Sequence, residues 1–87
     1  MTATGSHNRV MPRSVPFEHG RRYVALRTFD SFVAGRVYRY RWSDYNYRDG
    51  ETRATFYDSD QDREHDWSWF DNEPDSLCDE RFRLQPA

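Results

Sequence analysis

The stretch Val37-Tyr38-Arg39-Tyr40-Arg41-Trp42 alternates aromatic rings with arginines, and it decides how the chain folds. Successive side chains of a strand point to opposite faces, so a period of two indicates a strand with one face buried and one face in water. The rings would then lie in the core and the guanidinium groups in solvent. This pattern predicts a β fold and sets the parity against which neighbouring strands can be aligned.

Four further segments have strand-forming composition, at residues 21–29, 52–57, 67–69 and 81–84. Turn formers separate them, among them Asp49-Gly50 and the run at residues 72–75. Pro74 is placed to open a short 3₁₀ or helical turn near residues 74–79, because proline suits the first position of a helix. We therefore expect an all-β domain of five antiparallel strands. An open meander packed on a short helix over residues 75–82 is the alternative.

Aromatic side chains must build most of the core. The 87 residues include six Phe, six Tyr and three Trp, but only three Leu and no Ile. Each ring can bury about 150–250 Å², so rings can replace aliphatic side chains in a domain of this size. Residues 1–15 are small, polar and without period. We expect them to form a disordered tail ahead of a single small domain over residues 16–87.

A short motif occurs twice at the start of predicted strands. Phe17-x-x-Gly20-x-x-Tyr23 recurs fifteen residues later as Phe32-x-x-Gly35-x-x-Tyr38. Two copies are too few for a solenoid. We interpret each copy as a structural unit in which glycine supplies a positive φ and the phenylalanine fills one end of the core.

Five short strands with a tight turn before the last one resemble an SH3-like barrel. The spacing of Phe32, Gly35 and Tyr38 is similar to that in small bacterial domains of this build whose activity is not known. The resemblance covers residues 17–85 and implies a small five-stranded antiparallel SH3-like barrel or a bent meander. Such domains have no known activity, so the resemblance implies none. The acidic run at residues 58–66 differs from the basic or aromatic loops of peptide-binding SH3 domains, so peptide binding of that kind is not expected either.

The register of the central hairpin determines which side chains share a face. A two-residue turn at Asp49-Gly50 would place Trp42 opposite Tyr57, whereas a three-residue turn at 48–50 places it opposite Phe56. The second choice brings apolar faces together, so we predict that Trp42 and Phe56 are buried and Tyr57 is more exposed. The outer face would then carry Arg39 together with five candidate binding residues: Arg41, Tyr45, Tyr47, Arg53 and Tyr57.

Two interpretations of this aromatic and basic surface are open. Tyr and Arg are enriched at protein interfaces, so the face could bind another protein. In the second interpretation each arginine only covers a neighbouring ring, with Arg41 opposite Tyr57 and Arg53 opposite Tyr45. We expect a non-enzymatic protein-binding or assembly module.

A small barrel that binds single-stranded nucleic acid is the alternative function, because residues 1–48 carry a net charge of +6. Residues 49–87 carry −8, however, so the hairpin would neutralise much of the basic half.

Other candidate chemistry is incomplete. Asp58-x-Asp60-x-Asp62 matches the first three ligand positions of a calcium loop, but Arg63 occupies the position of the required glycine. We expect no metal site and no cofactor, and the acidic run 58–66 is expected to be a solvated loop. His65 would lie exposed in this loop, where carboxylates would raise its pKa. No nucleophile has an oriented base, so the sequence does not predict an enzyme.

The expected cellular location rests on three features that the sequence lacks: an internal disulfide, a signal peptide and a membrane span. Cys78 is the only cysteine, so an internal disulfide is excluded, and we expect a partly buried free thiol. The N-terminus lacks the apolar core of a signal peptide, and no segment approaches the roughly 18 apolar residues of a membrane span. We therefore expect a cytoplasmic protein.

Overall fold

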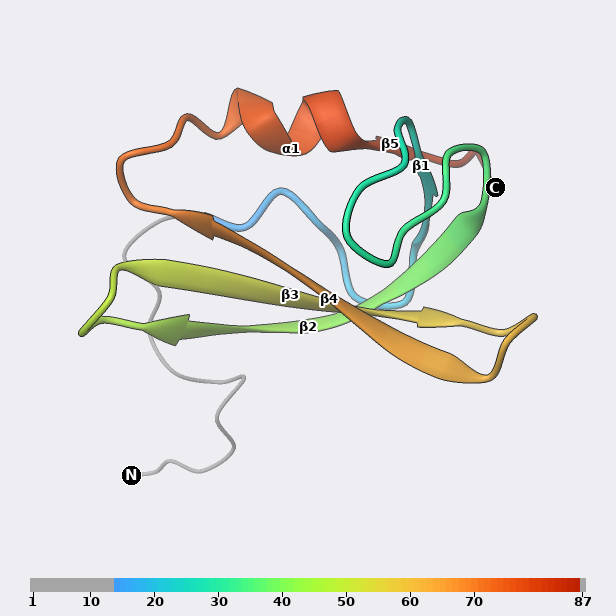
Figure 1. Cartoon of the computed structure of the whole chain (residues 1–87), viewed down its shortest axis with the longest axis horizontal. Helices are drawn as coiled ribbons and strands as arrows, with labels where there is room; N and C mark the ends of the chain where they lie inside the picture. The colour runs from blue at the N-terminus through green and yellow to red at the C-terminus, as the bar shows by residue number, and fades with distance from the viewer. Residues whose placement is uncertain (1–13, 87) are drawn as a thin grey trace.

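The computed structural model describes residues 14–86, which form one five-stranded antiparallel sheet and one short helix (Figure 1). The strands follow the order β4-β3-β2-β1-β5, so four strands form a meander and the last one returns to pair with the first. The elements are β1 (Arg22–Ala25), β2 (Val37–Asn46), β3 (Glu51–Asp58), β4 (Arg63–Phe70), α1 (Ser76–Arg81) and β5 (Phe82–Leu84). The predicted all-β class and strand number are confirmed.

The sheet bends so that α1 and β5 lie on the opposite side of the core from the long β2–β4 ribbon (Figure 1). The helix begins two residues later than the turn expected near 74–79, and it resembles the helix of the alternative fold. Its first amides bond to the segment before it, from Leu77 N–H to the Pro74 carbonyl (3.1 Å) and from Cys78 N–H to the Asp75 carbonyl (3.0 Å). The Cys78 thiol is buried and not oxidised to a disulfide.

The core on this inner face is aromatic, as the composition predicted. Phe17, just ahead of β1, lies near its centre, with ring centroids 5.1 Å from Tyr23 and 5.2 Å from Phe56. Phe56 stacks on Phe82 at 4.6 Å, which links β3 to β5. We call the opposite side of the sheet, where charged residues predominate, the outer face.

The repeated motif forms the same local structure twice. Gly20 and Gly35 have positive φ values of 81° and 86°. The ring of Phe32 meets Tyr38 edge-on at 4.8 Å, matching the contact of Phe17 with Tyr23. In each copy the residue after the phenylalanine donates its N–H to the tyrosine hydroxyl, at 2.8 Å in the first copy and 2.9 Å in the second. The predicted positive φ of both glycines is confirmed, but Phe17 lies near the centre of the core and does not fill one end of it.

The β2–β3 hairpin does not have the predicted register. Asn46 lies opposite Glu51, so the turn comprises four residues, 47–50, and not three. The longer turn keeps Gly50 in a left-handed conformation, with φ of 66°. It shifts the alignment of β2 on β3 by one residue, which exchanges the faces of the sheet.

A β-bulge at Arg41 then restores the core at the other end of the hairpin. Tyr40 lies opposite Phe56, but Trp42 lies opposite Thr55. The extra residue changes the parity of β2, so Trp42 is half-buried on the outer face and does not lie beside Phe56. That prediction is wrong, whereas Tyr57 is more exposed than Phe56 as expected.

The acidic run is also not one solvated loop. Asp58 ends β3 and is only 1% exposed, and residues 63–66 belong to β4. The charged residues of β4 alternate, with Glu64 and Asp66 outward and His65 inward, so the strand has a polar face without being a loop. The predicted tail lies outside the described residues up to residue 13, and Val15 packs against the core.

Candidate functional site: an arginine groove on the outer face

A groove of about 660 Å³ lies on the outer face where β1, β2 and β3 run side by side. Its charged side chains are Arg22 of β1, Arg39 and Arg41 of β2, and Asp60 of the β3–β4 turn. The remaining lining residues are His19, Gly20, Val37, Tyr57, Ser59 and Gln85. Three guanidinium groups thus face one carboxylate. We call this hollow the arginine groove.

Arg22 and Arg39 lie directly opposite each other in the β1–β2 ladder. The Arg22 carbonyl accepts a hydrogen bond from Gln85 N–H (2.9 Å), so the backbone polar groups of Arg22 point to the β5 side. Its pairing with Arg39 is therefore of the non-hydrogen-bonded kind, in which side chains lie closest. Like charges directly opposite each other destabilise a sheet. Within residues 14–86, neither guanidinium has an ion-pair partner.

The bulge positions the third arginine of the groove. This residue is Arg41. The bulge removes its carbonyl from the regular ladder, and the carbonyl accepts a hydrogen bond from Nδ1–H of His19. The Arg41 guanidinium lies over two rings, 5.2 Å from the centroid of Trp42 and 5.9 Å from that of Tyr57. Stacking occupies the faces of the guanidinium and leaves its in-plane N–H donors available.

Tyr57 forms one wall of the groove and is held by an acid. Its hydroxyl donates to Asp62 Oδ1 (2.5 Å), and this hydrogen bond raises the pKa of the phenol. The hydroxyl therefore stays protonated at neutral pH with its proton directed at Asp62. Tyr57 offers a ring surface to the groove rather than a hydrogen-bond donor.

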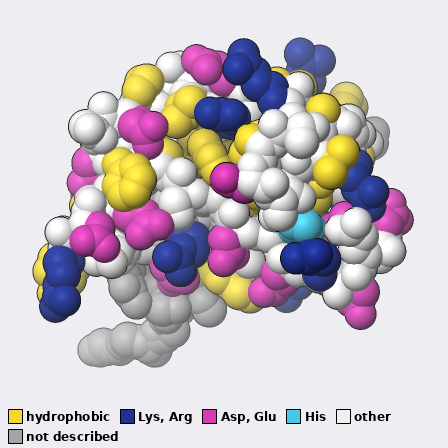
Figure 2. All heavy atoms as spheres, in the orientation of Figure 1, with side chains coloured by type: hydrophobic (Ala, Val, Ile, Leu, Met, Phe, Trp, Pro, Cys, Tyr) yellow, Lys and Arg dark blue, Asp and Glu magenta, His cyan; other side chains and the backbone are white. Residues whose placement is uncertain are grey.

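Charge changes sign across the outer face. One row of cross-strand neighbours runs from Arg22 through Arg39 and Tyr57 to Glu64. The groove is therefore basic over β1 and β2 and is followed by acidic residues on β4. Basic and acidic side chains are also interspersed on the face seen in Figure 2, so no broad field of one sign is presented there.

The five predicted site residues divide between two hollows. Arg41 and Tyr57 line the arginine groove. Tyr45, Tyr47 and Arg53 line a smaller hollow of about 310 Å³ at the other end of the hairpin. Arg41 does cover the ring of Tyr57, although Arg39 and not Arg41 lies opposite it in the ladder.

The smaller hollow largely satisfies its own polar groups. Tyr45 lies opposite Thr52 on the core side, not opposite Arg53, and donates its hydroxyl to Asp71 Oδ2 (2.6 Å). Nη2 of Arg53 lies 3.6 Å from Oε2 of Glu51, so the charge of Arg53 is already paired. Only Tyr47 projects freely, with 86% of its surface exposed in the turn. This hollow offers the ring of Tyr47 and no unpaired arginine, and its remaining charge is that of Asp44, whose Oδ1 is buried without a hydrogen-bond partner among the described residues.

Arg22 was absent from the predicted site because it belongs to a different strand. The repeated motif offers a way to find Arg22, because its two tyrosines, Tyr23 and Tyr38, lie opposite each other on β1 and β2. Aligning the two tyrosines places Arg22 opposite Arg39.

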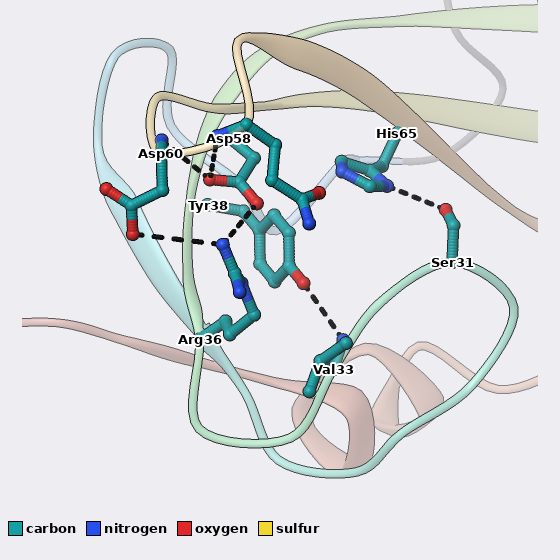
Figure 3. Close-up of polar contacts among 8 residues, drawn as sticks. Ser31, Val33, Arg36, Tyr38, Asp58, Asp60 and His65 are labelled. Atoms are coloured by element: carbon teal, nitrogen blue, oxygen red, sulfur yellow. Dashed lines mark hydrogen bonds and ion pairs between the residues drawn. The ribbon is translucent and has the colours of Figure 1, made fainter.

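A second polar cluster lies where β3 ends and β4 begins, next to the arginine groove (Figure 3). Asp58 is buried, and its Oδ2 accepts a hydrogen bond from Arg36 Nη2 (3.1 Å). Its other oxygen accepts from the backbone N–H of Asp60 (2.9 Å) and closes the β3–β4 turn. The carboxylate that would begin a calcium loop is thus bound to Arg36. No set of three His, Cys, Asp or Glu side chains within residues 14–86 is arranged to hold a metal ion.

His65 is buried in the same region, not exposed as predicted. Its Nδ1 lies 2.7 Å from the hydroxyl of Ser31, and its ring packs against Phe32 and Tyr38 (Figure 3). Burial lowers the pKa of this imidazole, and the charge of Arg63 adds to the effect. The expected rise from neighbouring carboxylates is therefore wrong. Nε2 is buried and has no hydrogen-bond partner among the described residues, so no carboxylate orients the ring as in a hydrolase triad.

No known protein family, curated protein or solved structure matches this chain. No helix within residues 14–86 is long and apolar enough to cross a membrane.

Proposed function

We propose that the domain is a non-enzymatic module that binds another protein, and that the arginine groove is its contact surface. The observation that carries the proposal is the Arg22–Arg39 pair, two like charges placed side by side in a groove and not ion-paired to any acid of residues 14–86. Such a pair opposes folding, and an anionic group of a partner would relieve it.

The surroundings of the groove support a protein partner. Arginine and tyrosine contribute much of the binding energy at protein interfaces, and Arg41 with Tyr57 forms such a pair at the groove wall. Tyr47 extends from the same hairpin and would enlarge the contact. We also propose an SH3-like fold, supported by the meander of β1–β4 and the return of β5 to β1 after one short helix. A cytoplasmic location belongs to the same proposal and agrees with a free thiol at Cys78.

Single-stranded nucleic acid is the second candidate, because basic grooves with rings can hold phosphates and bases. The acidic residues Asp60, Asp62 and Glu64 around Tyr57 would repel an extended phosphate backbone. Among the described residues that line the groove, Tyr57 is the only Phe, Tyr or Trp. Both features favour protein over nucleic acid.

Affinity capture from the native host tests the proposal. The baits are the wild type, the groove variant Arg22→Gln/Arg39→Gln and the control variant Arg27→Gln/Arg48→Gln. Both variants lose two charges, and Arg27 and Arg48 are exposed and lie outside the groove. We expect a protein that is retained by the wild type and the control, lost by the groove variant, and insensitive to nuclease.

Two outcomes would contradict this proposal. Identical sets of captured proteins for all three baits would show that the groove is not the contact surface. Loss of every captured protein after nuclease treatment would identify nucleic acid as the ligand.

A further inference from the structure

We propose that the arginine groove recognises a phosphate monoester, carried by a phosphorylated side chain of the partner protein. This inference rests on the proposed function and specifies the chemical group that the groove binds. It follows from the number of guanidinium groups, their placement on neighbouring strands and the charge around them.

The placement of the arginines suits an anion with more than two oxygens. A guanidinium can donate two parallel hydrogen bonds, and one such fork occupies both oxygens of a carboxylate. Arg22 and Arg39 come from adjacent strands at the same level and line one groove. Two forks can share a phosphate monoester, which has three terminal oxygens. A single carboxylate has only two oxygens, so the two guanidinium groups would have to share them.

The charge of the groove also matches a dianion. Arg22, Arg39 and Arg41 contribute three positive charges, and Asp60 contributes one negative charge. Asp60 also forms an ion pair outside the groove, since its Oδ2 lies 3.8 Å from Nη2 of Arg36. A phosphate monoester carries about −1.5 to −2 at neutral pH, close to the net charge of the groove.

The boundary of the groove limits the ligand to a compact anion. Glu64 lies next to Tyr57 in the cross-strand row, and Asp62 holds the Tyr57 hydroxyl. These acids would repel a second or third phosphate in a nucleic acid chain, whereas an isolated phosphate between Arg22 and Arg39 would be separated from Glu64 by Tyr57. A phosphorylated side chain is an isolated phosphate of this kind, and clusters of arginine are the usual means of binding one.

Titration of the full chain with O-phospho-L-serine tests the inference, with NMR to locate the binding site and calorimetry to measure affinity. We expect saturable binding on the order of 1–10 mM, as suits a single small anion. The Nε–Hε signals of Arg22 and Arg39 should shift. The groove variant should lose at least about tenfold in affinity, since each lost charge-assisted hydrogen bond corresponds to tenfold or more. The control variant Arg27→Gln/Arg48→Gln should bind as the wild type does.

Two comparison ligands decide the chemical class. L-glutamate at equal ionic strength should bind at least about tenfold more weakly than O-phospho-L-serine, because its side chain offers two oxygens and one negative charge where the phosphate offers three oxygens and a larger charge. A short oligothymidylate should bind no more tightly than O-phospho-L-serine. Equal binding of glutamate, tighter binding of the oligonucleotide, or binding of O-phospho-L-serine that the groove variant retains would each overturn the inference. So would the absence of saturation.

A phosphatase treatment separates this inference from the proposed function. If the captured protein is lost after phosphatase treatment, the phosphate group is required and the inference is supported. If capture survives phosphatase but still fails with the groove variant, the groove binds a protein through some other group. In that case the phosphate inference is wrong and the proposed function stands.

Discussion

Single residues of this domain divide into charges that the fold uses and charges that it does not. Arg36 is used, because it pairs with buried Asp58, whose other oxygen closes the β3–β4 turn. Arg22 and Arg39 are not used in this way, since they face each other and no carboxylate of residues 14–86 pairs with them. Two guanidinium groups that add repulsion and no ion pair to the fold are the reason for proposing that they bind a ligand.

The buried imidazole of His65 gives a prediction about pH. Burial lowers its pKa, so the folded protein keeps the ring neutral at a pH where the unfolded chain, with a value of about 6.5, already takes up a proton. The unfolded state then binds more protons, and stability falls as pH decreases below about 6.5. Urea unfolding between pH 7.5 and 5 should show this loss, and His65→Gln should weaken the dependence. If the free energy of unfolding depends on pH as steeply in His65→Gln as in the wild type, the loss of stability at low pH does not come from His65.

Two aromatic residues should differ in their contributions to stability. Phe17 is 8% exposed and packs among the core rings, whereas Tyr47 is 86% exposed. We expect Phe17→Ala to reduce the free energy of unfolding by about 3–5 kcal/mol and Tyr47→Ala to change it by less than about 0.5 kcal/mol. Urea denaturation of both variants checks this. A large loss in Tyr47→Ala would mean that the turn packs against the core.

At the level of elements, the β2–β3 hairpin shows where sequence reasoning succeeds and where it stops. The alternation of residues 38–42 correctly identified a strand, and the repeated Phe-x-x-Gly-x-x-Tyr motif correctly identified two turns with positive φ. The bulge at Arg41 has no local signal, because it results from fitting a four-residue turn to the core rings at the other end. One extra residue was enough to move Trp42 to the outer face.

The candidate site was predicted only in part for the same reason. Arg41 and Tyr57 belong to the hairpin, and their contact follows from local pairing. Arg22 is separated from them by a loop, and only the pairing of β1 with β2 brings it to Arg39. The acidic stretch was misread because its charges alternate along β4, which composition alone does not distinguish from a loop.

The turn of this hairpin depends on Gly50. Its φ is 66°, and an added Cβ would lie 3.1 Å from Asp71 Oδ2, the oxygen that accepts the Tyr45 hydroxyl. Gly50→Ala should therefore reduce the free energy of unfolding by about 1–2 kcal/mol from backbone strain, and further from this contact. Gly35→Ala is the control, because its φ is also positive but nothing lies within 4 Å of the added Cβ. Thermal unfolding that shows an equal or smaller loss in Gly50→Ala would contradict the role of the contact.

On the scale of the whole molecule, the bent sheet keeps the core and the groove on separate faces. The aromatic rings fill the inner face, so the outer face is free to carry charge. The basic half of the sequence and the acidic half do not neutralise each other fully. Arg22 and Arg39 both belong to the basic half, and they lie opposite each other on adjacent strands.

The most direct test of the central claim is a comparison of stability between Arg39→Gln and Arg39→Lys, the second of which keeps the charge. If the arginines of the groove serve a ligand and oppose folding, Arg39→Gln should have the higher free energy of unfolding at about 0.01 M salt, by a few tenths to about 1 kcal/mol. The difference should disappear near 1 M salt, where charges are screened over about 3 Å. A higher stability of Arg39→Lys at low salt would contradict the account, because the positive charge would then be part of what holds the sheet together.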